Sequence, residues 1–327
     1  MMDFGLVVPL DGQFAYFSFD NQDGGQAWQG PVATFGTVKQ VAGVGGTLDI
    51  AENLAGVWVG YDGTDVVQYT QQSEEGSVWI AGPAAAAVSA AIPDVPTVPP
   101  TPPIPPKPPA GHMAGAPAFS EFAGAMVVPF STGQLVPYTR PSDDVSGKWS
   151  VGTPFGTDVD SATLIVSSYD NPPDKAPSAA NEWDVVALQA GSLTHYYHDA
   201  QGWHTGETFA SGAVGRPGFI QSSFGTPPNT NFEVVVPMAG SLQHFWRANA
   251  ASGTPWVGPT AWFGPGNATA AAVIQSSDDA LHVVAAAGGE LVHWTRAGQV
   301  SEWSQVASFA TGAFGMPGLI QFPVPIG

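Results

Sequence analysis

Short apolar or β-branched runs recur along the chain in groups of four, separated by Gly, Pro, Asn or Ser. The clearest group spans residues 215–264, where the runs lie at 215–222, 231–237, 241–247 and 255–259. Runs of this length between turn residues are typical of strands joined by tight turns. We therefore expect each group to form a four-stranded antiparallel meander, whose strands we call a, b, c and d in chain order.

The same unit occurs six times, and a tryptophan marks strand d in each copy. These tryptophans are Trp28, Trp79, Trp149, Trp203, Trp256 and Trp303. The first copy lacks a strand a, whereas residues 315–321 form a strand a with nothing after it. A C-terminal strand that completes the first unit would close a ring of sheets. The pattern predicts an all-β fold: a six-bladed β-propeller of four-stranded antiparallel blades, closed by the C-terminal strand joining the N-terminal blade.

One interval between these tryptophans is longer than the others, because a proline-rich segment interrupts the repeat. We divide the chain into blades 1 and 2 at residues 1–92, a Pro-rich linker arm at 93–114, and blades 3 to 6 with the closing strand at 115–327. Such a proline run favours polyproline II and acts as a semi-rigid spacer. We interpret the arm as a solvated surface segment, and the alternative is a peptide ligand for a protein domain with an aromatic groove.

The composition agrees with this fold and excludes several partners. With 40 Gly and 31 Pro in 327 residues the chain is poorly suited to helices, and its 44% hydrophobic content argues against disorder. Its 27 acidic and 8 basic residues give a formal net charge of −19. Nucleic acids and anionic membranes require a basic surface, so we expect no nucleic-acid partner and no membrane insertion.

Catalytic and metal-binding motifs are missing from the sequence. There is no Cys, which excludes disulfides and thiolate chemistry, and neither Gly-x-Ser-x-Gly nor His-Glu-x-x-His occurs. The Asp-rich turn at 20–24 lacks the spacing of a calcium loop. We expect no catalytic residues, no metal and no cofactor. The N-terminus lacks the basic flank and long apolar core of a signal peptide, which leaves the compartment open, a secreted or cell-surface one included.

Strand c carries the most informative polar residues. One repeat position holds His195, His244 and His293. A second position, three residues further along, holds Arg140, Arg247 and Arg296. In a chain so poor in cations, three arginines in one register are hard to explain by general solubility.

These repeated residues allow two interpretations. In the structural one, each His bonds the backbone of a neighbouring blade and each Arg pairs with a strand-b acid, Glu233 or Asp184. In the functional one, they form a ring of ligand sites that bind sugar hydroxyls beside an aromatic platform. Both interpretations stay open at the level of sequence.

Two tryptophans fall outside the six-fold set. A large ring repeated once in every blade is expected to fill the wedge between blades. Trp246 and Trp262 do not repeat in this way. They are therefore better candidates for stacking against a sugar.

The run Gly-x-Pro-Gly-Phe-Ile-Gln-Ser, followed by Asn-Phe-Glu-Val-Val-Val-Pro and Leu-x-His-Phe-Trp-Arg, resembles the repeats of bacterial and fungal β-propeller lectins and lectin-like proteins. The resemblance covers nearly the whole chain outside the Pro-rich arm and implies a sugar-binding propeller. Six-bladed fucose-binding lectins are similar in blade number and in a strand-d Trp followed by Gly. Their strand-b Arg and strand-c Glu have no counterpart here, so the resemblance does not imply fucose specificity.

We expect a multivalent carbohydrate-binding propeller without catalytic activity, whose partners are glycans or glycoconjugates. Its predicted ligand-binding residues are Arg140, Arg247, Arg296, His195, His244, His293, Trp246, Trp262, Glu233 and Asp184. The alternative is a protein-interaction scaffold that uses a propeller face and the Pro-rich arm. A propeller hydrolase would need converging acids unique to one blade, whereas the candidate residues repeat.

Overall fold

The computed structural model shows an all-β propeller of four-stranded antiparallel blades, as the sequence pattern predicts. It describes residues 3–20, 27–36, 44–47, 57–61, 66–71, 79–81, 118–120, 125–140, 149–167, 182–227, 229–250, 253–276, 278–299, 301–312 and 314–322. The predicted Pro-rich arm at 93–114 lies outside these residues, so its boundaries and its proposed protein partner stay predictions. Among the described residues there is no helix long and apolar enough to cross a bilayer.

The described strands form six four-stranded sheets. In hydrogen-bonded order, the first comprises β24 (Gly318–Phe322), β1 (Asp3–Leu10), β2 (Gln13–Asp20) and β3 (Ala27–Phe35). The second comprises β4 (Val44–Thr47), β5 (Val57–Tyr61), β6 (Val66–Gln71) and β7 (Trp79–Ala81). The third comprises β8 (Ala118–Ser120), β9 (Ala125–Pro129), β10 (Leu135–Thr139) and β11 (Ser150–Val151).

The other three sheets follow the same order. The fourth comprises β12 (Val159–Ser167), β13 (Glu182–Gln189), β14 (Ser192–Asp199) and β15 (Gly202–Phe209). The fifth comprises β16 (Gly218–Thr226), β17 (Asn229–Met238), β18 (Ser241–Arg247) and β19 (Val257–Phe263). The sixth comprises β20 (Ala268–Gln275), β21 (Ala280–Ala287), β22 (Glu290–Ala297) and β23 (Ser304–Thr311). We name each blade by its strands in chain order, and the β1–β3 blade includes β24.

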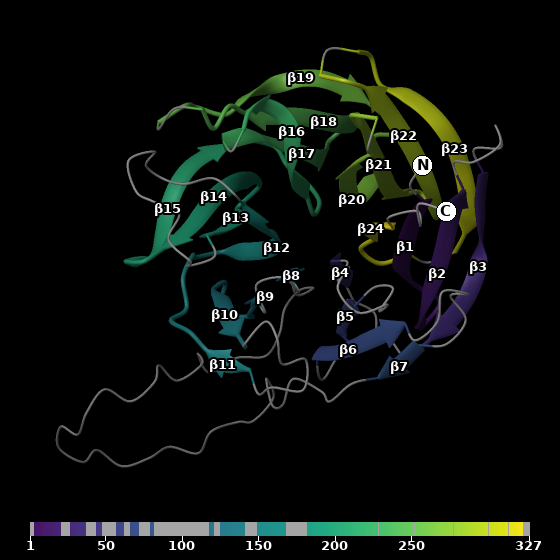
Figure 1. The fold of residues 1–327 in the computed structure, drawn as a ribbon, viewed down its shortest axis with the longest axis horizontal. Helices are drawn as coiled ribbons and strands as arrows, with labels where there is room; N and C mark the ends of the chain where they lie inside the picture. The colour runs from purple at the N-terminus through teal and green to yellow at the C-terminus, as the bar shows by residue number, and fades with distance from the viewer. Residues whose placement is uncertain are drawn as a thin grey trace.

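The sheets stand around a common centre (Figure 1), with strands such as β20, β24 and β12 towards it and β15, β19 and β23 at the rim. The C-terminal strand β24 pairs antiparallel with β1, for example Leu319 with Leu6. It is therefore the innermost strand of the N-terminal sheet, the pairing that the unmatched repeat at the C-terminus predicts.

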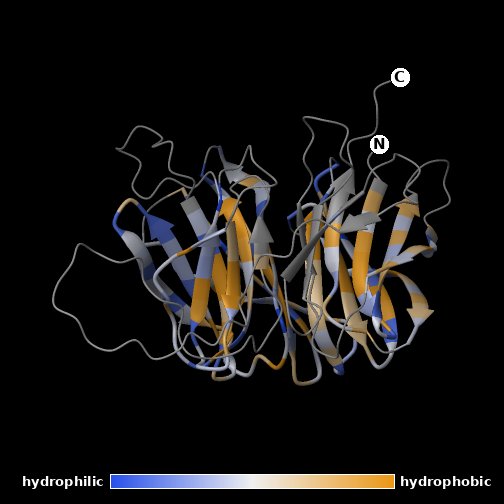
Figure 2. Cartoon of the chain, turned by 90° about the horizontal axis from the view of Figure 1, so that it is seen from below, coloured by the Kyte–Doolittle hydropathy of each residue, from blue (hydrophilic) through white to orange (hydrophobic). Residues whose placement is uncertain are grey.

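The apolar core lies between neighbouring blades, because each blade is covered on both faces. From Asn231 to Met238 every residue of β17 is buried, and so is every residue of β21. Strands covered on both faces are expected to be continuously apolar rather than alternating. The outer strand β19 is mostly exposed. Figure 2 shows this arrangement as apolar strands inside the blades.

Stacked Phe–Trp pairs join four pairs of consecutive blades. A phenylalanine close to the end of strand d lies on the strand-d tryptophan of the next blade, with ring centroids 3.9 to 4.5 Å apart. The pairs are Phe155–Trp203, Phe209–Trp256, Phe263–Trp303 and Phe309–Trp28. The prediction that strand-d tryptophans fill the wedges is confirmed for these four. Trp149 instead lies beneath the guanidinium of Arg140, 4.8 Å from its ring centroid, and the side chain of Trp79 is outside the described residues.

Candidate functional site

The repeated histidines of strand c bind acids on strand b of the same blade. His195 Nε2 lies 2.7 Å from Asp184 Oδ1, and His244 Nε2 lies 2.6 Å from Glu233 Oε2. All four residues are at most 1% exposed. With the Nε2 proton donated to the carboxylate, the Nδ1 atom of each ring is left as an acceptor.

An arginine of the next blade donates to the Nδ1 atom of each ring, and in His244 the Thr260 hydroxyl also lies 2.7 Å from that atom. Arg247 Nη1 lies 3.3 Å from His195 Nδ1, and Arg296 Nη1 lies 3.3 Å from His244 Nδ1. Arg296 Nη2 is also 3.8 Å from Glu233 Oε2. Burial lowers the pKa of Arg296, and Glu233 opposes this. A chain of carboxylate, imidazole and guanidinium thus links two blades at each of these junctions.

The structural interpretation of the sequence predicts that the histidines bond a neighbouring backbone, and this is wrong for both. Their ring nitrogens contact an acid of their own blade and the arginine of the next, and His244 Nδ1 also contacts the hydroxyl of Thr260. Burial lowers the pKa of His244; the hydrogen bond and charge of Glu233 oppose this, and Arg296 adds to it. The predicted pairing of a repeated Arg with a strand-b acid is confirmed for Arg296 and Glu233.

The third histidine has a different environment, at the junction with the β1–β3 blade. His293 Nε2 lies 3.0 Å from Nδ1 of His282, which occupies the strand-b position of the acids. Its Nδ1 accepts a hydrogen bond from Trp28 Nε1 at 3.3 Å. Phe19, in the register of the arginines, packs against the His293 ring with centroids 5.0 Å apart. Among the described residues, neither a carboxylate nor a guanidinium therefore contacts the His293 imidazole.

A serine completes the cluster in two blades but does not make it catalytic. Ser167 Oγ donates to Asp184 at 2.5 Å, and Ser222 Oγ donates to Glu233 at 3.3 Å. In a serine hydrolase the imidazole lies between the hydroxyl and the carboxylate and takes the hydroxyl proton. Here the carboxylate lies between the other two groups, so the histidine cannot activate the serine.

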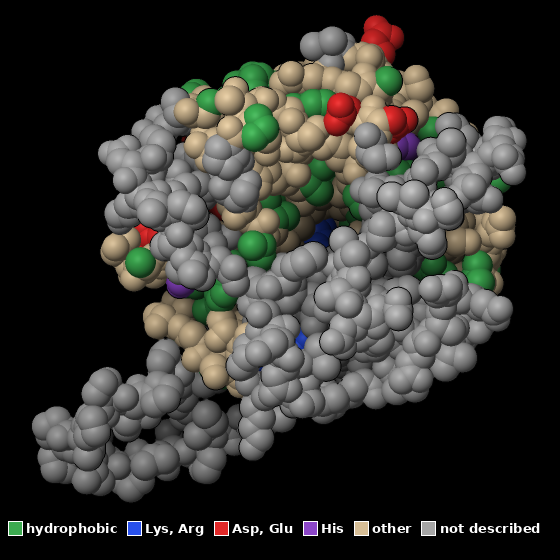
Figure 3. All heavy atoms as spheres, viewed as in Figure 1, with side chains coloured by type: hydrophobic (Ala, Val, Ile, Leu, Met, Phe, Trp, Pro, Cys, Tyr) green, Lys and Arg blue, Asp and Glu red, His purple; other side chains and the backbone are tan. Residues whose placement is uncertain are grey.

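The predicted site residues are thus mostly interior. The three arginines, three histidines and two acids are at most 8% exposed and lie between blades or strands. In the space-filling view (Figure 3), Lys and Arg atoms lie deep in the central hollow and acidic side chains lie nearer the rim. The ligand-binding role predicted for these eight residues stays a prediction, and their geometry favours a structural one.

The two unrepeated tryptophans differ from each other. Trp246 is partly buried and lies opposite Glu233 on one side and Val257 on the other. Trp262 is 72% exposed on the outer strand β19. Of the ten predicted residues, only Trp262 presents most of its side chain to solvent.

A pocket of about 500 Å³ lies on the outer part of the β12–β15 blade, facing the β8–β11 blade. It is lined by Gly156, Thr157, Gln189, Ala190, Ser192, Thr194, Tyr196, Thr205 and Thr208. Tyr196 donates its hydroxyl proton to Gln189 Oε1 at 2.8 Å, and Gln189 Nε2 donates to Thr157 Oγ1 at 3.1 Å. Burial raises the pKa of Tyr196, and the hydrogen bond to Gln189 opposes this. The phenol therefore stays protonated and remains a donor.

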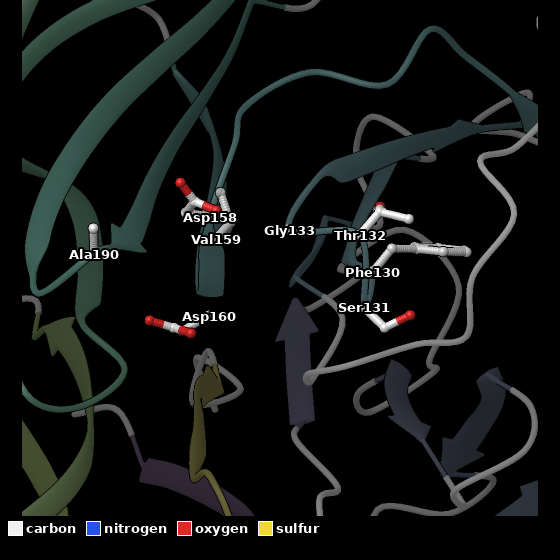
Figure 4. A pocket seen from close by; sticks show the side chains of 8 residues that line it. All are labelled: Phe130, Ser131, Thr132, Gly133, Asp158, Val159, Asp160 and Ala190. Carbon is white, nitrogen blue, oxygen red and sulfur yellow. The ribbon is translucent and has the colours of Figure 1, made fainter.

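A second pocket of about 390 Å³ adjoins the first and shares Ala190 with it. Figure 4 shows the β9–β10 turn at 130–133 on one side, and Asp158 and Asp160 with Ala190 on the other. Both aspartates are exposed. Within the described part of the chain, no three His, Cys, Asp or Glu side chains gather closely enough to hold a metal ion.

The hydroxyl groups of the first pocket are not among the residues predicted from the sequence. Thr194 and Thr208 lie opposite each other, with their hydroxyl oxygens 3.1 Å apart. Threonine is common in strands for its shape alone, so the residue type gives no signal. The available signal is a comparison between repeats, because the same register position holds Val292 in the β20–β23 blade and Ala15 in the β1–β3 blade.

No protein-family model matches the chain, and no curated protein sequence matches it. Several solved structures are similar to it. The fucose-specific lectin from Aleuria aurantia is 15% identical, with a TM-score of 0.63 over 94% of this chain and 92% of that one. A variant of the AofleA protein from Arthrobotrys oligospora with three arginines replaced by alanine is 11% identical, with a TM-score of 0.61 over 97% and 86%. A putative 6-phosphogluconolactonase from Bacteroides uniformis is 12% identical, with a TM-score of 0.50 over 97% and 84%. At these identities the likeness establishes the fold, a propeller of the kind found in fungal fucose-binding lectins.

Proposed function

We propose that this chain is a multivalent, non-catalytic carbohydrate-binding propeller, in which the six sheets are six blades of one ring closed by the β24–β1 pair. Its partners are neutral glycans or glycoconjugates. The fold is shared with fungal lectins, and the structure of the Aleuria aurantia lectin with Fucα1-6GlcNAc supports the choice of glycans as the class to test first.

The observation that carries the proposal is the uncharged pocket of the β12–β15 blade. Its polar lining consists of threonine and serine hydroxyls, one phenol and one amide, with no charged side chain among the described lining residues. Sugar hydroxyls both donate and accept hydrogen bonds, so they match such a lining. A volume of about 500 Å³ is also within the usual range for small-ligand sites.

Gln189 orients the pocket. Its amide accepts from Tyr196 and donates to Thr157, so both of its polar ends are held by residues on either side. A preorganised amide loses less rotational freedom when it binds a ligand. We therefore assign Gln189 the main positioning role for the bound sugar.

The buried clusters serve the same function indirectly. Each one fixes the spacing between consecutive blades through Arg247 with His195 or Arg296 with His244. Sites on different blades gain avidity only if their separation matches the spacing of the glycans on a surface. In this proposal the clusters supply that rigidity and do not contact the sugar.

Replacing Gln189 with Ala should weaken sugar binding about tenfold. The substitution removes the amide that positions the sugar, and each of two hydrogen bonds that are lost or misplaced contributes a net of about 0.5–1.5 kcal/mol. The measurement is isothermal titration with L-fucose, D-galactose and D-mannose, preceded by a glycan array to select the sugar. Thr34→Ala is the matched control, because Thr34 is exposed and holds the register position of Thr208 in the β1–β3 blade. The proposed function fails if the unmodified chain binds nothing on the array and none of the three sugars raises its melting temperature.

Sugar binding should change by less than about twofold between pH 6 and pH 9. Among the described residues that line the pocket, Tyr196 is the only titratable one, and burial raises its pKa above the ordinary tyrosine value. Titrations of the selected sugar across this range check the prediction. A loss of affinity as the pH falls through the range of histidine would instead point to the histidine clusters as the binding site.

A further inference from the structure

The pocket of the β12–β15 blade has an equivalent position in the next blade. In the first blade, Thr194 lies opposite Thr208, next to the pair Leu193 and Phe209. In the β16–β19 blade, Gln243 lies opposite Trp262, next to the pair Leu242 and Phe263. Phe209 and Phe263 both stack on the tryptophan of the following blade. The Trp262 side chain therefore points to the face of its sheet that Thr208 occupies in the pocket.

Trp262 is the most exposed of the large apolar side chains in the described part of the chain. It is 72% exposed, against 55% for Val214 and 44% for Val32. Leaving an indole of this size in water forgoes the free energy that its burial would give. A flat aromatic face at the rim of a propeller can instead receive the C–H face of a pyranose.

Gln243, beside Trp262, is buried over most of its surface. It is 9% exposed, and among the described residues no hydrogen-bond partner is found for its side-chain amide. Its amide atoms are not among the fully buried side-chain atoms that lack a partner, so the amide keeps contact with solvent. In the preceding blade the equivalent Thr194 has such a partner in Thr208. The amide of Gln243 thus leaves a donor and an acceptor for a ligand next to the exposed indole.

The surrounding residues keep part of the pocket and change the rest. Ser241 holds the position of Ser192, whereas Met238 replaces Gln189 and Phe245 replaces Tyr196. The second position therefore has fewer side chains that can hydrogen-bond, and Met238 and Phe245 are themselves buried. It suits a ligand that stacks on one face and bonds through one edge.

We propose that Trp262 and Gln243 form a second sugar site, at the outer rim between the β12–β15 and β16–β19 blades, for a neutral pyranose. The pyranose stacks its C–H face on Trp262 and bonds one hydroxyl to the Gln243 amide. This proposal rests on the proposed function and extends it, because it places two unlike sites on adjacent blades. A glycan surface could engage both at once.

The test uses the full chain labelled with 5-fluorotryptophan, titrated with methyl glycosides of α-L-fucose, α-D-mannose and β-D-galactose. The fluorine line that disappears in Trp262→Phe identifies Trp262. That line should shift on adding at least one glycoside. Trp262→Ala should remove one site from the calorimetric stoichiometry and leave the other within about twofold, whereas Trp262→Phe should keep the site with about tenfold weaker affinity.

Two further variants distinguish binding at the first site from binding at the second. Gln243→Ala should weaken only the second site, and Gln189→Ala only the first. Val214→Ala, at another exposed apolar side chain, should change neither. One outcome disproves the second site and leaves the proposed function standing. In that outcome glycosides bind the unmodified chain, Gln189→Ala removes all of the binding, and the fluorine line of Trp262 never moves. If no glycoside binds the unmodified chain, both proposals are overturned.

Discussion

Lowering the pH from about 7 to about 4 should destabilise the folded chain by roughly 3 kcal/mol or more, and His282→Gln should remove part of that loss. The reason is the histidine pair between the β20–β23 and β1–β3 blades. His282 Nδ1 and His293 Nε2 lie 3.0 Å apart, and the residues are 7% and 1% exposed. A proton added to either ring would create a charge that is buried away from water, and a second proton on the other ring would add repulsion between the two charges.

The direction follows from the two pKa values. Burial lowers the pKa of His282 to about 4, with Asp278 opposing, and lowers that of His293 to about 3, with His282 adding to the effect. Both folded values lie below the unfolded value of 6.5, so below about pH 6.5 the unfolded chain binds more protons than the folded one. The free energy of unfolding is therefore highest, as far as this pair is concerned, above that pH, and it falls progressively towards pH 4 and below.

The other groups around this pair do not compensate. Ser276 Oγ lies 3.2 Å from His282 Nε2, and the rings of Phe4 and Phe19 cover the pair. Among the described residues, the one carboxylate that favours charge on either ring is that of Asp278, and it acts on His282 alone. By contrast, His244 has Glu233 within hydrogen-bonding distance. The ring closure is thus expected to be more sensitive to acid than the junction that holds His244.

Guanidinium unfolding followed by circular dichroism, repeated from pH 7 to pH 4, measures the effect. His282→Gln removes one titrating group, and His282→Glu places a carboxylate where Glu233 stands in the preceding blade. Both should flatten the curve. His204→Gln is the control, because the His204 side chain is 37% exposed. An unmodified chain equally stable at both ends of the range would contradict the prediction, and so would a His282→Gln variant that loses as much as the parent.

The fold could be predicted from the sequence because its signals are local. Apolar runs between turn residues locate the strands, and one tryptophan in each unit marks the wedge in which Phe209 and Trp256 stack. The unmatched C-terminal run is equally visible, and it pairs with β1. No long-range information was needed for any of these features beyond the assumption that equal units pack in equal ways.

The candidate site could be predicted only in part, because a repeated polar residue has the same spacing whether it faces water or a neighbour. The interval between His195 and Arg247 is one repeat, so their register could be seen, but not that they touch. Burial depends on the wedge between two blades, which the sequence does not describe. Trp262 could be predicted as a candidate because no tryptophan occupies its position in the other repeats. Gln243 could not be predicted, because its burial beside Trp262 is visible only in the structure.

Removing the carboxylate of Glu233 should cost about 3–5 kcal/mol of stability, the usual penalty for leaving a buried charge unpaired. Glu233 is fully buried, accepts from His244 at 2.6 Å and from Ser222 at 3.3 Å, and lies 3.8 Å from Arg296 Nη2. In Glu233→Ala, His244 and Arg296 lose the carboxylate, whereas Ser222 Oγ keeps the backbone oxygen of Asn231 as an acceptor at 3.2 Å. Glu233→Gln should cost less, because its amide oxygen still accepts from His244 while the Arg296 charge loses its partner.

A double-mutant cycle with Arg296→Met separates the charge from the hydrogen bonds. Part of the loss in Glu233→Ala should return when Arg296 is also replaced, because the uncompensated cation is then gone. Glu290→Ala is the control: Glu290 is an exposed acid on β22, and its replacement should change the free energy of unfolding by no more than about 0.5 kcal/mol. Denaturant unfolding at pH 7 gives all of these values, and a Glu233→Ala loss below about 1 kcal/mol would contradict the structural role of the cluster.

Sugar binding by the folded Glu233→Gln protein then decides between the two roles that the sequence left open for this residue. A structural Glu233 predicts lower stability with unchanged affinity at the Gln189 pocket, because the pocket belongs to the preceding blade and Glu233 does not line it. A Glu233 that contacts the ligand predicts the reverse, namely weaker binding with little change in the free energy of unfolding. The complete burial of Glu233 favours the first outcome, since a side chain with no exposed surface can reach a sugar only if the two blades separate.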